Sequence, residues 1–280
     1  MDFKTGLLVI TLFVGCFALP KPEDDMSIYF DHVDRDARIV GGTQAADGSH
    51  PHMAAMTTGT LVSNYLCGAS VVGRRSVLTA AHCINAVFSF GSLTSSLRIT
   101  VGTNRWNSGG QSYRLARNVT HPNFVSATLR NDIGLLITSS DIVTNNRVQV
   151  VPLSYDFVGE NVRVRVAGWG RIRSGGAFSA TLLELEKSTI NGARCVSLVA
   201  QAAIDFNRPD APAVEPEKEV CTFHSAGHGT CNGDSGSALI RIDRRQQIGV
   251  VSWGFPCARG APDMFVRVSA FSSWLRSNIV

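Results

Sequence analysis

Six cysteines remain in this chain once an apolar leader is set aside, and they restrict the fold more than any other feature. Residues 7–19 form an apolar run behind Lys4 and end near the small residue Ala18, a pattern typical of a secretory signal peptide spanning residues 1–18. Its removal would also remove Cys16. The remaining cysteines are Cys67, Cys83, Cys195, Cys221, Cys231 and Cys257. An even number in a secreted chain predicts three disulfides, although six cysteines permit about 15 pairings.

A short acidic segment follows the leader. Residues 19–38 hold six acidic residues and two prolines but no cysteine, and they end at Arg38, directly before the sequence Ile39-Val40-Gly41-Gly42. This abrupt change to an apolar start indicates an activation pro-segment at 19–38 that is cut after Arg38. With no cysteine, the cut segment would have no covalent tether.

The rest of the chain, residues 39–280, is typical of an all-β protein. Short β-rich runs alternate with Gly, Ser and Asn, and the clearest are 69–78, 97–101, 132–138, 162–167, 237–242 and 248–253. Only residues 269–278 predict a helix of any length. A faint seam near 155–160 divides the region into two similar lengths. Its arginines are scattered singly, which argues against nucleic acid, and no internal run is long enough for a membrane span.

Three short segments carry residues suited to nucleophilic catalysis. His82 stands beside Cys83, Asp132 precedes an apolar strand, and Ser235 lies between two glycines in Gly233-Asp234-Ser235-Gly236. A serine is a weak nucleophile unless a base accepts its proton and a third group orients that base. Taken singly, each residue has an ordinary structural explanation: a core histidine, a strand-end cap and a tight turn.

Taken together, the segments resemble the chymotrypsin family of serine endopeptidases across residues 39–280. The chain order His, Asp, Ser is that of chymotrypsin. The matching segments are IVGG at 39–42, TAAHC at 79–83, NDIGLL at 131–136, GWG at 168–170, GDSG at 233–236 and SWG at 252–254. The resemblance implies two six-stranded antiparallel β-barrels with the active site between them and a C-terminal helix. It also implies the pairings Cys67–Cys83, Cys195–Cys221 and Cys231–Cys257.

The same resemblance assigns the catalytic roles. Ser235 is expected to attack the scissile carbonyl, His82 to move the proton and Asp132 to orient the imidazole. The backbone N–H groups of Gly233 and Ser235 would form the oxyanion hole. No cofactor is implied. Between Cys83 and Asn131 there is no Asp or Glu, so no calcium is expected there, and no metal site is evident.

By resemblance, Asp234 acts in activation. After a trypsin-like protease cuts behind Arg38, the new α-amine of Ile39 is expected to turn inward and pair with the Asp234 carboxylate. The pair would then order the oxyanion hole and the specificity pocket. The precursor is therefore expected to be a zymogen.

The expected specificity pocket holds Gly229 at its floor, Gly254 and Ser252 at its wall, and Asp263 at the other side of its base. An open, uncharged floor fits large apolar side chains. Gly229 with Asp263 also resembles the broad-specificity crustacean collagenolytic proteases and some insect chymotrypsin-like enzymes. The Asp263 carboxylate could accept a basic or amide side chain, or it could point away into a local hydrogen-bond network; the sequence leaves both open.

These features predict a secreted, monomeric, chymotrypsin-like to broad-specificity digestive endopeptidase of a gut lumen. Its partners would be protein or peptide substrates, an activating protease and protein protease inhibitors. The alternatives are a collagenolytic-type enzyme, an immune or cascade protease, or a non-catalytic homologue.

Two further features of the sequence concern its setting. Asn118 begins the one glycosylation sequon. Residues 39–280 keep only two lysines, Lys187 and Lys218, against 20 arginines. Because lysine loses its charge near pH 10.4, this bias indicates an alkaline lumen or, equally well, codon bias.

Overall fold

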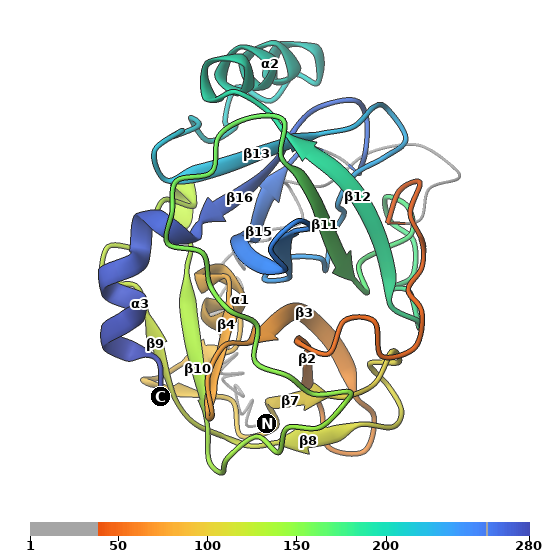
Figure 1. Cartoon of the computed structure of the whole chain (residues 1–280), viewed down its shortest axis with the longest axis vertical. Helices are drawn as coiled ribbons and strands as arrows, with labels where there is room; N and C mark the ends of the chain where they lie inside the picture. Colours follow the sequence, from red (N-terminus) through yellow and green to blue (C-terminus); the bar gives the residue numbers. More distant parts are fainter. Residues whose placement is uncertain (1–38, 256) are drawn as a thin grey trace, which may run out of the picture.

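The computed structural model describes residues 39–255 and 257–280, and the expected signal peptide, pro-segment and Arg38 lie outside them. The described chain is built mainly from two antiparallel β-sheets, which Figure 1 shows one above the other. A two-stranded ribbon, β5 (Phe88–Ser89) and β6 (Ser92–Leu93), stands apart from them. The all-β architecture predicted from the sequence is confirmed.

The first sheet has the strand order β8-β7-β2-β3-β4-β10-β9. In chain order its strands are β2 (Met53–Thr58), β3 (Asn64–Val71), β4 (Ser76–Thr79), β7 (Arg98–Val101), β8 (Gln111–Tyr113), β9 (Leu115–Thr120) and β10 (Gly134–Thr138). The two outer strands, β8 and β9, are separated only by Arg114. The sheet is therefore curled, and its ends meet through the chain itself.

The second sheet has the order β1-β12-β11-β14-β15-β16-β13, and an additional pairing of β12 with β13 closes six of its strands into a barrel. Its strands are β1 (Thr43–Gln44), β11 (Arg163–Gly168), β12 (Leu183–Thr189), β13 (Glu219–Phe223), β14 (Ala238–Arg241), β15 (Gln246–Gly254) and β16 (Asp263–Arg267). The connection between the two sheets, residues 139–162, contains the expected seam.

Each end of the chain packs on the opposite half. Strand β1 pairs with β12 of the second sheet, while helix α3 (Ser272–Asn278) lies against the first sheet (Figure 1). Phe271 and Leu275 join the larger hydrophobic core, which contains side chains of the first sheet together with Val250 and Val266 of the second. The two halves therefore share one core, in addition to a smaller core inside the closed barrel.

Two local expectations need correction. Residues 69–78 are a hairpin of β3 and β4 rather than one strand, because Val72 N–H donates to the carbonyl of Ser76 and turns the chain. The C-terminal helix is not the only long one, since α2 (Gly192–Asp205) has 14 residues. Its N-cap, Asn191, accepts hydrogen bonds from Ala193 N and Arg194 N. The other helical elements are α1 (Ala81–Asn85) and the 3-10 helices η2 (Ser126–Thr128) and η3 (Val268–Phe271).

Three disulfides join Cys67 to Cys83, Cys195 to Cys221 and Cys231 to Cys257, as the family resemblance implies. The second of them ties α2 to β13. Within residues 39–255 and 257–280, no helix is long and apolar enough to cross a membrane.

Candidate active site

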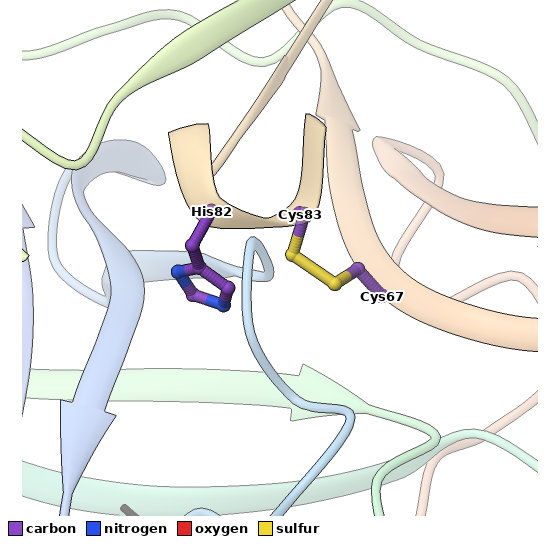
Figure 2. A group of neighbouring side chains, drawn as sticks. All are labelled: Cys67, His82 and Cys83. Atoms are coloured by element: carbon purple, nitrogen blue, oxygen red, sulfur yellow. A yellow bond between two sulfur atoms is a disulfide. The ribbon is translucent and has the colours of Figure 1, made fainter. Parts of the chain in front are cut away.

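His82 is held on a short, rigid turn between the two sheets. It lies on α1, where the neighbouring Cys83 is bonded to Cys67 of β3 (Figure 2). Cys67, His82 and Cys83 are also the one group of three candidate metal ligands among the described residues. Both sulfur atoms are used by the disulfide, and His82 Nδ1 is engaged by Asp132, so this cluster is not a ligand set.

Asp132 is fully buried and binds His82 twice. Its Oδ1 accepts the backbone N–H of His82 at 2.8 Å, and its Oδ2 lies 2.7 Å from His82 Nδ1. Oδ2 also accepts the hydroxyl of Ser252 from β15 at 2.6 Å. These contacts require Nδ1 to carry a proton, so the neutral imidazole presents its other nitrogen, Nε2, as an acceptor.

Ser235 lies in the loop that precedes β14, on the second sheet. Its carbonyl accepts the N–H of Gly68 at 2.8 Å, which brings the loop against β3 and the disulfide. Within the described parts of the chain, no hydrogen bond links Ser235 Oγ to His82 Nε2. Catalytic hydrogen bonds of this kind commonly form fully only when substrate is bound.

The loop before Ser235 leaves two N–H groups free. Gly233 has a φ of +92°, which favours glycine, and its carbonyl accepts the hydroxyl of Tyr65 at 2.8 Å. The N–H groups of Gly233 and Ser235 donate to no group among residues 39–255 and 257–280. This geometry matches an oxyanion hole, which needs donors that are not already engaged.

Comparison with known proteins now identifies the family. The model of the protein family described as Trypsin matches residues 39–275. The chain belongs to the trypsin family. It is 34% identical over 249 residues to alkaline trypsin B of Manduca sexta, covering 86% of this chain and 91% of that protein. It is 32% identical over 241 residues to chymotrypsin-2 of Vespa crabro, covering 86% and 99%.

The chain is therefore a serine endopeptidase of this family. Its Asp234 is fully buried in the loop that begins after Gly229, the residue that pairs with Val40. The two carboxylate oxygens of Asp234 accept the N–H groups of Gly170 at 2.9 Å and Cys231 at 3.0 Å. Ile39 is also fully buried, and Val40 exchanges two backbone hydrogen bonds of 3.1 Å with Gly229. Burial raises the pKa of Asp234 to about 7, and no ion pair reaches this carboxylate from the residues that the structure describes.

The expected pocket residues of the peptidase converge around Asp263. A Cβ added to Gly229 would lie 3.2 Å from Asp263 Oδ2, and one added to Gly254 would lie 3.4 Å from Oδ1. Asp263 is only 3% exposed. Its Oδ2 accepts a hydrogen bond from the N–H of Thr230 at 2.8 Å and forms an ion pair with the ammonium of Lys187. The local network considered from the sequence is therefore present, and the carboxylate still faces both glycines.

Sequence reasoning missed three contacts of the site. Ser252, expected at the pocket wall, directs its hydroxyl at Asp132, while Lys187 and Tyr65 were given no role. The only local signal for Lys187 was its place in the alternating pattern of β12, whose buried positions are Leu183, Leu185, Lys187 and Thr189.

Asn118 lies on β9 and is half-buried; its amide donates to Thr120 Oγ1 at 3.2 Å. His224 and His228 stack with ring centroids 4.2 Å apart and share Ser225 as a hydrogen-bond partner.

Proposed function

We propose that the chain is a secreted digestive endopeptidase, made as a zymogen, that cleaves peptide bonds after large uncharged side chains. The observation that carries the catalytic part is the buried Asp132 carboxylate, which binds both the backbone and the ring of His82. A buried carboxylate in this geometry stabilises the imidazolium that forms when His82 accepts a proton.

The proposed reaction has two stages, and in each of them His82 first accepts a proton and then donates it. Ser235 Oγ attacks the substrate carbonyl while His82 Nε2 accepts the hydroxyl proton. The N–H groups of Gly233 and Ser235 stabilise the resulting oxyanion. His82 then gives its proton to the leaving amine, and an acyl-enzyme remains on Ser235. A water molecule then attacks the acyl carbonyl while His82 accepts its proton. His82 returns this proton to Ser235 Oγ as the acid product leaves.

The zymogen proposal rests on Asp234 and Ile39. The cut after Arg38 would create an α-amine at Ile39, which is already buried next to the loop that holds Asp234. An amine in this position would supply a cation for the buried Asp234 carboxylate, which has no ion pair with any residue that the structure describes. An activating trypsin-like protease would make the cut.

The specificity and setting are proposed from the pocket and the relatives. Gly229 and Gly254 leave room for a large side chain, and the ion pair of Asp263 favours uncharged ones. The similar proteins include both trypsins and a chymotrypsin, and some are named alkaline, which suits the low lysine content of this chain. A collagenolytic-type, immune or cascade role is the alternative, and protein inhibitors are expected partners.

The direct test is Ser235→Ala in protein cut after Arg38. Turnover of a peptide anilide with Leu or Phe before the scissile bond is expected to fall on the order of 10⁶-fold, with unchanged circular dichroism. Ser237→Ala is the matched control, because the Ser237 hydroxyl is buried, has no hydrogen-bond partner among the described residues and should be dispensable. Appreciable turnover by Ser235→Ala, or none by the cut wild type, would refute the proposal.

A further inference from the structure

Lys187 occupies a position at which an apolar side chain would be expected. Side chains alternate along β12, and its inward positions hold two leucines and a threonine besides this lysine. Lys187 is only 4% exposed as a residue, and its side chain is only 1% exposed. A lysine is seldom fully buried unless a partner balances its charge, so the burial itself points to a specific pairing.

Its partner lies two strands away in the wall of the closed barrel. Lys187 belongs to β12 and Asp263 is the first residue of β16, and β13 runs between these strands. Thr222 of β13 is in register with both Thr189 of β12 and Asp263. The lysine side chain therefore spans the width of β13, and its Nζ donates to Asp263 Oδ2.

The same carboxylate forms the base of the proposed specificity pocket. It lies between Gly229 and Gly254, with Oδ2 toward the first glycine and Oδ1 toward the second. Strand pairing fixes this position, because Asp263 is in register with Gly254 across β15 and β16. A side chain that entered over the two glycines would thus meet Asp263, whose Oδ2 is already bonded to the Lys187 ammonium.

A bare carboxylate at this place would attract an arginine or lysine of the substrate, because a buried charge interacts strongly with an opposite charge nearby. Here the ammonium of Lys187 already balances it. A substrate cation would then face the like charge of Lys187 at close range, in surroundings that water does not screen. Uncharged side chains meet no such repulsion.

We propose that Lys187 is a specificity determinant of this peptidase: it neutralises the Asp263 carboxylate at the base of the pocket, so that uncharged side chains are accepted and Arg and Lys are rejected. The inference rests on the proposed function only in taking Gly229, Gly254 and Asp263 as the pocket for the substrate side chain. It assigns the selection to a residue that acts through its ion pair with the Asp263 carboxylate.

The test is to remove the lysine charge and measure selectivity on matched peptide anilides with Arg, Lys, Leu or Phe before the scissile bond. In Lys187→Met, the ratio of kcat/KM for Arg to that for Leu is expected to rise about 10²-fold, or about 2.7 kcal/mol. The double variant Lys187→Met/Asp263→Asn should lose that gain. Lys218→Met is the matched control, since Lys218 is the only other lysine of residues 39–280, is 46% exposed and pairs with Glu215.

A second measurement does not depend on turnover. Benzamidine, a small aromatic cation, should bind Lys187→Met and Lys187→Gln at least 10-fold more tightly than wild type in calorimetry, while Lys187→Arg should keep the weak binding. The glutamine variant preserves a hydrogen-bond donor if methionine prevents folding. An unchanged Arg-to-Leu ratio and unchanged benzamidine affinity in folded variants would overturn the role of Lys187. Loss of all turnover in the cut wild type, with the benzamidine shift retained, would instead overturn the proposed function alone.

Discussion

The stability of the uncut precursor should fall as the pH rises, because of one carboxylate. Burial raises the pKa of Asp234 from its usual 3.8 to about 7 in the folded chain. A carboxyl whose pKa is raised by folding binds more protons in the folded state between these two values. The free energy of unfolding therefore decreases as the pH increases through that range. At about 1.4 kcal/mol per pH unit, the unpaired carboxylate costs about 4 kcal/mol at pH 7 and above.

The perturbation is Asp234→Asn, made in a precursor that Arg38→Gln keeps uncut. Urea unfolding at pH 4, 5.5 and 7.5 should show that the parent loses about 4 kcal/mol more than Asp234→Asn between the first and last values. Comparing the two proteins removes the contributions of other buried groups, such as Glu219, whose pKa burial also raises to about 7. Parallel pH profiles for the two proteins would refute this reasoning.

Cutting after Arg38 moves the pH dependence to a higher range, with the same sign. The α-amine of Ile39 has an unfolded pKa of about 7.7–8.0, and pairing with Asp234 raises the folded value. Its contribution is fully present below the unfolded value and is lost as the pH rises through the folded one. The free energy of unfolding of the cut protein should therefore exceed that of the uncut protein most clearly near pH 7.5. An activity profile that collapses by pH 9 would contradict operation in an alkaline lumen.

Two further substitutions test the support of the site. Ser252→Ala removes the 2.6 Å hydrogen bond to Asp132 and should lower kcat about 10-fold, with KM little changed, because the proposed His82 orientation loses one restraint. An equal kcat in a folded variant would show that this bond is dispensable; Ser237→Ala serves as the control. Tyr65→Phe removes the hydroxyl that binds the carbonyl of Gly233 at 2.8 Å, and kcat should fall about 3- to 10-fold in single-turnover assays. A change confined to KM would contradict the role of Tyr65 in positioning the oxyanion donors.

The sequence was most informative where the chemistry requires a particular residue at a particular place. His82, Asp132 and Ser235 stand in short segments whose composition is unusual, and the six cysteines have no partners other than one another. The fold class followed from the same segments and from the alternation of short β-rich runs. The two sheets and their shared core are consistent with it.

What the sequence did not predict depends on contacts between distant residues or on a weak local pattern. Lys187 and Asp263 are 76 positions apart, and nothing near Lys187 shows which charge will face it. Ser252 and Asp132 are 120 positions apart. Helix α2 was missed although Cys195, Val199 and Ala202 recur at spacings of four and three, because Asn191-Gly192 resembles a turn.

The crossing of the chain ends has a consequence for biosynthesis. The segment at 39–44 lies against the second sheet, and helix α3, which follows every strand of both sheets in the described chain, completes the core of the first. Domains tend to fold in the order in which they leave the ribosome, but here the core of the first sheet is incomplete until Phe271 and Leu275 have been made. The surroundings of His82 and Asp132 are therefore complete only after both Ser235 and α3 have been synthesised.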